Sequence, residues 1–169
     1  MKDARRCVTP ATELVATRWG AGAAFADFDG DSDLDLYGPN YAEFDVQEQK
    51  GTVDWFDKGV LQFPQNFVPQ DNTLYRNTGD GTFTDITREA GAEGSGRSLG
   101  VVATDFDDDG DMDIFIANDV GFNNLLRNDG GGRFTDVTGP AGLSMSGWSN
   151  GAVLGDPDGD GDLDIYIAR

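Results

Sequence analysis

Hydrophobic and polar residues alternate with a period of two in short runs along the chain. GVVATDF (100–106) and GAAFADF (22–28) each lead into an acidic segment, and β-branched and aromatic residues follow in DIFIAN (113–118), DLYGPN (35–40) and DIYIAR (164–169). Such runs are typical of short β-strands. No segment has the 3.6-residue period of an amphipathic helix, so the pattern predicts an all-β chain.

The strand pattern recurs as an internal repeat. LYRNTGDGTFTDIT (74–87) aligns without a gap on LLRNDGGGRFTDVT (125–138), 51 positions later. In each copy a glycine-rich turn separates two strand-like runs, which predicts a hairpin. Four short strands in about 51 positions match one blade of a β-propeller. Parallel β-solenoids have shorter repeats, and a helical solenoid fits worst.

The same register divides the whole chain into units. It predicts a segment at 1–18 that carries the remnant outer strand of a preceding blade (residues 5–9), blade 1 at 19–98, blade 2 at 99–149 and a partial blade 3 at 150–169. Blade 1 contains an insertion within 39–70 that breaks the repeat. The insertion is either a cap over one face or a contact loop on a binding face.

Hydrophobic residues that recur with the repeat are expected to form the core between blades. They are Leu74, Phe83, Leu125 and Phe134. Trp19 and Trp148 also occupy equivalent positions, so a structural role is expected for both.

Three acidic loops stand at one place in the repeat: DFDGDSDLD (27–35), DFDDDGDMD (105–113) and DPDGDGDLD (156–164). Positions 1, 3, 5, 7 and 9 are aspartate in all three copies. Alternating carboxylates around a tight turn supply the hard oxygen ligands that Ca²⁺ prefers, whereas a solvated hairpin tip needs only one or two such residues. The candidate metal residues are Asp27, Asp29, Asp31, Asp33, Asp35, Asp105, Asp107, Asp109, Asp111, Asp113, Asp156, Asp158, Asp160, Asp162 and Asp164.

Two features of the loop refine the calcium hypothesis. Position 6 is Ser32, Gly110 or Gly161, where the chain must turn sharply and a positive φ is expected. The D-x-D-x-D-G spacing resembles the first half of an EF-hand loop, but no glutamate stands at position 12 and strands flank the loop. Asp108 stands where the other copies have glycine, so it is the aspartate least expected to touch the metal.

Composition narrows the function classes. The 169 residues include 31 acidic and 12 basic residues, for a formal charge of −19, so nucleic acid and anionic membranes would be repelled. Histidine is absent, which excludes Ser-His-Asp and Cys-His catalysis and zinc sites built on imidazole. Cys7 is the single cysteine, and neither a signal peptide nor an apolar run of membrane-spanning length is visible.

The motif G-x-x-x-x-DFDxDGDxDxxxxN followed by LYRNxGDGTFTDIT resembles FG-GAP/VCBS repeats, the blades of integrin-α-type β-propellers. Within that group it is most similar to the cartilage acidic protein family. The resemblance covers roughly residues 20–38 and 72–169. It implies a propeller with one Ca²⁺ in each of the three loops, held by side chains at positions 1, 3, 5 and 9 and by the backbone carbonyl at position 7.

The resemblance also implies a cellular location and a biological role. Its members are extracellular, surface-bound or periplasmic, and they act in adhesion and recognition, with protein or glycan partners. A propeller needs at least four blades, which 169 residues with this insertion cannot form. We therefore expect either a part of a larger surface protein or a chain completed by copies of itself.

Three functional hypotheses follow. The first is a non-catalytic, calcium-stabilised recognition or adhesion scaffold. The second is the structural subunit of a calcium-stabilised extracellular homopolymeric filament, assembled head to tail. The third is a metal-dependent hydrolase, which is disfavoured because the chain offers no histidine and saturated sites leave no open position for substrate.

Overall fold

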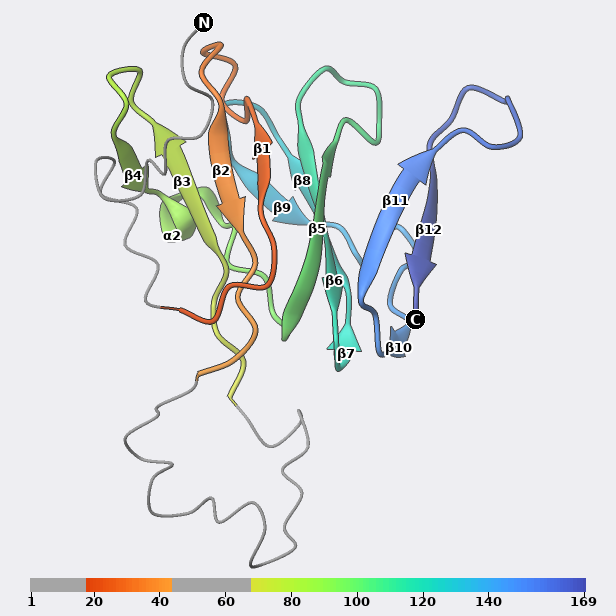
Figure 1. Cartoon of the computed structure of the whole chain (residues 1–169). Coiled ribbons are helices and arrows are strands. Elements are labelled where there is room, and N and C mark those ends of the chain that lie inside the picture. The colour runs from red at the N-terminus through yellow and green to blue at the C-terminus, as the bar shows by residue number, and fades with distance from the viewer. Residues whose placement is uncertain (1–17, 44–67) are drawn as a thin grey trace, which may run out of the picture.

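The computed structural model describes residues 18–43 and 68–169, and the regular structure in these ranges is almost entirely β-strand. Two four-stranded antiparallel sheets and a two-stranded ribbon stand side by side (Figure 1). Blade 1 consists of β1 (Ala24–Ala26), β2 (Asp35–Gly38), β3 (Thr73–Asn77) and β4 (Phe83–Asp85). Blade 2 consists of β5 (Ser98–Thr104), β6 (Asp113–Asn118), β8 (Asn124–Asn128) and β9 (Phe134–Asp136). The ribbon consists of β11 (Gly151–Gly155) and β12 (Asp164–Ala168).

Strand order within each sheet follows the chain, β1-β2-β3-β4 and β5-β6-β8-β9. Antiparallel neighbours that follow one another along the chain are what the repeat predicted, and the four-stranded unit is confirmed. The chain therefore has the architecture of an incomplete β-propeller, with successive blades stacked face to face (Figure 1).

Three short elements were not predicted. A single helical turn, α2 (Thr87–Ala90), follows β4, and the short strands β7 (Gly121–Phe122) and β10 (Ser146–Gly147) pair with each other. The Asp85 carboxylate accepts hydrogen bonds from the backbone N–H and the hydroxyl of Thr87 at 3.0 and 2.6 Å. This local turn competes with strand extension, so β4 ends at Asp85, before the end of the predicted run FTDIT (83–87).

The two faces of each blade differ according to what packs on them. All six residues of β6 are buried, because blade 2 lies between blade 1 and the ribbon. In β2, burial alternates along the strand, and Tyr37 points into the contact with blade 2. Tyr37 and Phe115 occupy matching places in the two blades, and both side chains are fully buried.

Two hydrophobic clusters join the blades. The first lies between blade 1 and blade 2 and includes Phe28, Tyr37, Leu74, Ile114, Ile116 and Phe134. The second joins blade 2 to the ribbon through Phe115, Ala117 and Leu125, against which Ala152, Ile165 and Ile167 pack. The hydrophobic core is therefore distributed between blades, and each blade depends on its neighbour for burial.

The expected core residues are mostly buried. Leu74, Leu125 and Phe134 are at most 8% exposed, and Phe134 packs edge-on against Phe28 of blade 1 at 5.7 Å between ring centroids. Phe83 is only partly buried. The structural role expected for both tryptophans stays a prediction, because Trp19 is 48% exposed although its ring contacts Tyr41, and Trp148 is 64% exposed.

Glycine is required where the innermost strands of neighbouring blades meet. A Cβ on Gly100 of β5 would lie 3.0 Å from the Cα atom of Gly151 and 3.1 Å from the carbonyl oxygen of Asn150. Because those neighbours are backbone atoms, a side chain at this position would require β11 to shift away from β5, and glycine allows the observed close approach.

The loops β1–β2, β5–β6 and β11–β12 all project from the same end of the blades (Figure 1). These are the three acidic loops. The remnant strand at residues 5–9 and residues 44–67 of the insertion lie outside the described residues, so those expectations and the proposed unit boundaries stay predictions.

Candidate metal centres

Each acidic loop is the turn of a hairpin, and the strand register holds its two ends together. Ala26 pairs with Asp35, Thr104 with Asp113 and Gly155 with Asp164. The residue just before the loop is thus opposite loop position 9. The chain must reverse within eight residues, which brings positions 1 and 9 close together.

Two positions in every loop have a positive φ. Position 6 has φ values of 76° at Ser32, 95° at Gly110 and 99° at Gly161, as the spacing predicted. Position 4 has φ values of 80° at Gly30, 58° at Asp108 and 77° at Gly159. This second left-handed residue was not predicted, although glycine in two of the three copies was a signal for it. Asp tolerates this conformation better than most residues.

Backbone N–H groups in each loop point at the carboxylate of position 1. The Asp27 carboxylate accepts hydrogen bonds from the N–H groups of Gly30, Asp31 and Ser32 at 2.8, 3.1 and 2.9 Å. The Asp105 carboxylate accepts two such bonds and the Asp156 carboxylate three. These bonds fix the curvature of the loop, and the curvature sets the directions of the other aspartate side chains in the loop.

Position 9 is the buried member of the first two loops. The Asp113 carboxylate accepts N–H donation from Phe106 at 2.9 Å and from Asn128 at 2.8 Å. The Asp35 carboxylate accepts the equivalent bonds from Phe28 at 3.1 Å and Asn77 at 2.8 Å. Position 9 therefore joins the loop to the third strand of its own blade.

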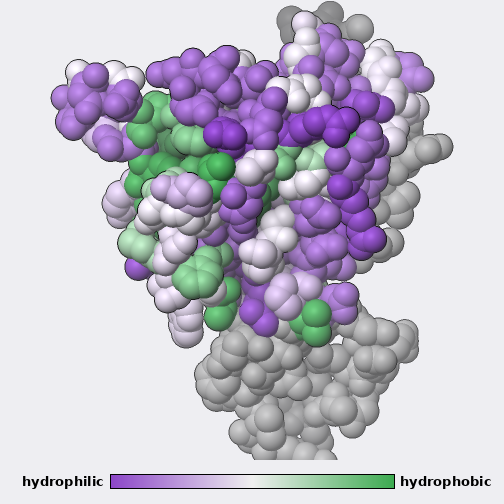
Figure 2. Space-filling model, turned by 180° about the vertical axis from the view of Figure 1, so that it is seen from behind, coloured by the Kyte–Doolittle hydropathy of each residue, from purple (hydrophilic) through white to green (hydrophobic). Residues whose placement is uncertain are grey.

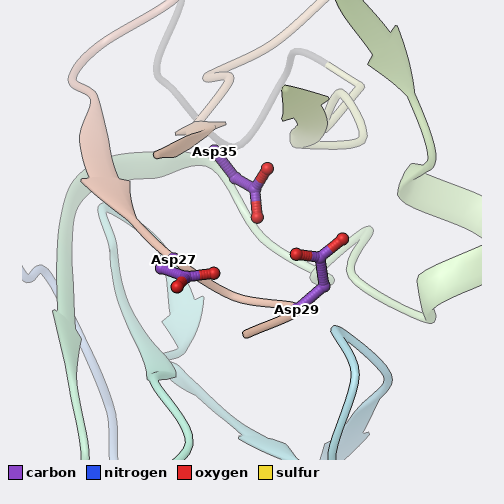
Figure 3. A group of neighbouring side chains, drawn as sticks. All are labelled: Asp27, Asp29 and Asp35. Carbon is purple, nitrogen blue, oxygen red and sulfur yellow. The ribbon is translucent and has the colours of Figure 1, made fainter. Parts of the chain in front are cut away.

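Three carboxylates converge in each loop. One oxygen from each of Asp27, Asp29 and Asp35 lies within 4.8 Å of the others, and Figure 3 shows the three side chains directed toward a shared space. The same holds for Asp105, Asp107 and Asp113. Two oxygens bound to one Ca²⁺ at 2.3–2.6 Å can be at most about 5 Å apart, so the donor set and its spacing fit this ion.

Burial and, after it, neighbouring carboxylates raise the pKa of three aspartates in loops 1 and 2. Burial, followed by the charges of Asp107 and Asp109, raises the pKa of Asp113 to about 6 despite two backbone hydrogen bonds. Burial also raises the pKa of Asp35, and burial and the neighbouring Asp31 raise that of Asp29. A bound cation would compensate these like charges and favour the ionised forms.

The third loop is built differently. Its converging group is Asp156, Asp158 and Asp160, all exposed, and it does not include Asp164. Asp164 is exposed, whereas Asp35 and Asp113 are at most 1% exposed. Those two are covered by the third strand of their blades, and β12 pairs only with β11 among the described strands.

Not every candidate ligand joins the converging groups. Position 5 belongs to the group only in loop 3, although its carboxylate accepts the N–H of position 7 in all three loops, at 2.9, 2.9 and 3.0 Å. No position 7 side chain is a member of these groups in the described residues. The side chains that lie outside the groups are Asp31, Asp33, Asp109, Asp111, Asp162 and Asp164. The full ligand set of each loop stays a prediction.

Sequence reasoning missed two asparagines that hold the loops in place. The Asn128 side-chain amide donates to the Phe28 carbonyl of loop 1 at 2.8 Å and to the Met112 carbonyl of loop 2 at 3.1 Å. The Asn77 amide donates to the Leu34 carbonyl of its own loop at 3.2 Å. Their alignment in the RN dipeptide of the repeat was the available signal.

Sequence comparisons agree with this architecture. The family model described as FG-GAP-like repeat matches residues 65–116 and 105–167. The chain belongs to the FG-GAP-like repeat family. The two matches together extend over most of the chain, and they include the second and third acidic loops.

Two relatives were found among characterised proteins. Cartilage acidic protein 1 of Homo sapiens is 34% identical over 100 residues, and its counterpart in Xenopus tropicalis is 34% identical over 102 residues. Each match covers 57% of this chain and 15% of the relative, so the chain corresponds to a small part of those proteins. In the described part of the FG-GAP-like chain, no helix has the length and apolar character needed to cross a membrane.

Proposed function

We propose that this FG-GAP-like chain is a calcium-binding, non-catalytic recognition or adhesion scaffold that works on the extracellular side of the membrane. The observation that carries the proposal is the convergence of three carboxylates in loops 1 and 2, with one of them fully buried in each. A buried carboxylate beside two others is costly without a compensating cation. The cation would supply structural stability, and the loops would supply oxygen ligands.

The free calcium concentration outside cells also supports the proposed extracellular location. The converging carboxylates of loop 3 are all exposed, so this loop is expected to bind Ca²⁺ weakly. Weak sites are filled where free calcium is near millimolar, as it is outside cells. The similarity to cartilage acidic protein 1 points the same way, and protein or glycan partners are the classes we propose for recognition.

Two aspartates in loop 2 provide a matched test. Asp107→Asn removes one carboxylate of the converging group, and Asp108→Asn removes the same charge from the neighbouring position outside it. In calorimetric titration with CaCl₂ we expect three sites for the wild type and for Asp108→Asn, and two for Asp107→Asn.

Thermal unfolding measures the consequence for stability. Ca²⁺ at a hundred times its Kd stabilises the native state by about 2.7 kcal/mol per site. We therefore expect the melting temperature to fall when a chelator is added, and to fall less in Asp107→Asn than in Asp108→Asn. Unchanged melting with and without chelator would contradict the proposal.

A further inference from the structure

Two arginines at matching positions accompany the first two acidic loops. Arg76 of β3 is opposite Thr84 of β4, and Arg127 of β8 is opposite Thr135 of β9, so both occupy the same place in their blades. Each arginine immediately precedes the asparagine whose N–H donates to loop position 9. Figure 2 shows a mainly hydrophilic surface at the end of the blades where the loops project. The two arginines bring positive charge to the neighbourhood of crowded carboxylates.

Arg127 has an acidic partner in its own blade. Its Nε and Nη2 atoms donate to one oxygen of the Asp129 carboxylate at 2.9 and 2.7 Å. The other oxygen accepts the Thr135 hydroxyl at 2.5 Å, which holds the carboxylate in place. The hydrogen bond and charge of Asp129, followed by the charges of Asp107 and Asp109, raise the pKa of Arg127. Loop 2 is therefore accompanied by a neutral pair of charges.

Blade 1 lacks the equivalent partner. Thr78 aligns with Asp129, and its hydroxyl donates to the Asp80 carboxylate at 2.8 Å. Asp80 also accepts hydrogen bonds from the N–H and the hydroxyl of Thr82, so its carboxylate is engaged within the turn. In the part of the chain that the structure describes, no hydrogen bond or ion pair engages the Arg76 side chain. Its positive charge is therefore not neutralised locally as that of Arg127 is.

The charge of Arg76 acts on loop 1. Arg76 and Asp29 line one cavity of about 100 Å³ where blade 1 meets blade 2. Glu89 and Arg133, whose charges are opposite, line the same cavity. Burial, followed by the charge of Asp31, raises the pKa of Asp29, and the charge of Arg76 opposes that rise. Because Asp29 is one of the three converging carboxylates, the positive charge of Arg76 already compensates part of this group.

We propose that Arg76 is a built-in counter-ion of loop 1, which compensates Asp29 in the metal-free protein and opposes the entry of Ca²⁺. The inference rests on the proposed calcium binding, and it gives loop 1 a lower affinity than loop 2, where Arg127 is paired. A single charge near a solvent-exposed Ca²⁺ site changes the affinity by about threefold at low ionic strength, and salt screens the effect.

Calcium titration of loop 1 alone tests the proposal. Asp107→Asn and Asp158→Asn, combined in the 169-residue chain, each remove one converging carboxylate from loops 2 and 3 and leave loop 1 intact. In this background Arg76→Gln is expected to raise the affinity for CaCl₂ about threefold at low salt and less at high salt. Arg88→Gln is the matched control, because it removes the same charge from α2, where the Arg88 side chain is 85% exposed. It is expected to leave the affinity unchanged.

Thermal unfolding separates a counter-ion from a residue that only supports the fold. In chelator, Arg76→Gln is expected to lower the melting temperature, because Asp29 then lacks a compensating charge. In saturating Ca²⁺ the loss should be smaller, because a residue that weakens binding must stabilise the metal-free form relative to the bound form. Equal losses in chelator and in calcium would overturn the proposal.

The titration can also contradict the inference without contradicting the proposed scaffold. An affinity that Arg76→Gln leaves unchanged or lowers would overturn the counter-ion role, and so would an equal increase in Arg88→Gln. A background chain that binds no Ca²⁺, beside a wild type that does, would overturn it as well. A wild type that binds no Ca²⁺ would overturn both this inference and the proposed function.

Discussion

The side-chain amide of Asn128 in blade 2 donates a 2.8 Å hydrogen bond to the backbone carbonyl of Phe28 in blade 1. Phe28 lies between the first two aspartates of loop 1, and Asn128 also donates to the Met112 carbonyl in loop 2. One buried side chain therefore links two candidate calcium loops across the boundary between blades.

Asn128→Ala is expected to weaken calcium binding at two loops. Loss of one buried hydrogen bond is worth about 1 kcal/mol, which corresponds to a roughly fivefold loss in affinity at each affected site. Asn77→Ala is the control, because its amide reaches only loop 1. In calorimetric titrations Asn128→Ala should weaken two sites and Asn77→Ala one. Superimposable isotherms for the two variants would show that the contact across the blades does not matter.

Gly91→Ala is expected to destabilise the contact between blade 1 and blade 2. Gly91 has a φ of 72°, and an added Cβ would lie 2.8 Å from the backbone carbonyl oxygen of Phe134 in blade 2. Gly81→Ala has a similar backbone cost, since Gly81 has a φ of 90°, but it faces open space. In urea unfolding both variants should lose about 1 kcal/mol from the left-handed backbone. Any further loss specific to Gly91→Ala measures the contact, and equal losses would argue against it.

Asp108→Gly is expected to stabilise the protein. Asp108 has a φ of 58° at a position where the other two loops have glycine, and the left-handed conformation costs a non-glycine residue about 1 kcal/mol or more. The greater flexibility of glycine in the unfolded chain offsets part of the gain. Asp108→Asn controls for the lost charge. If urea unfolding gives both variants the same free energy, charge and not backbone conformation is responsible.

Tyr41→Phe is expected to reduce the sensitivity of stability to alkaline pH. The Tyr41 hydroxyl donates to the Asp119 carboxylate at 2.5 Å, and burial followed by this carboxylate raises the pKa of Tyr41 from 10.0 to about 12. The folded state thus retains a proton that the unfolded state loses between pH 10 and 12, so the free energy of unfolding decreases as pH rises through that window.

Urea unfolding across this pH range measures the effect. Tyr37, whose pKa burial also raises, keeps part of the slope in both proteins. The variant should therefore show a shallower slope than the wild type, and it should lose about 1 kcal/mol at neutral pH with the hydrogen bond. Parallel slopes would contradict this account of Tyr41.

Much of the fold could be predicted because local pattern and repeat length act together. Alternation in DIFIAN (113–118) and the turn after NLLRN (124–128) each specify a strand or hairpin, and the 51-residue spacing specifies how many strands form a unit. Loop position 6 was predicted for the same reason, because a sharp turn needs a positive φ wherever the loop is placed. The helical turn α2 was missed because Thr87–Ala90 is a single turn, too short to show a helical period, and no side-chain cap marks its start.

The sequence by itself determined the β-strands, the blade unit and the place of the three acidic loops, because these depend on period, spacing and residue type within a few dozen residues. The tertiary structure decided which aspartates differ from their copies. Asp35 and Asp113 are buried because a third strand covers each of them, and Asp164 is exposed although its local sequence is nearly the same. It also decided that Asn128 reaches back one hundred residues to Phe28. Burial and contacts between blades depend on neighbours distant in the chain, and no local pattern encodes them.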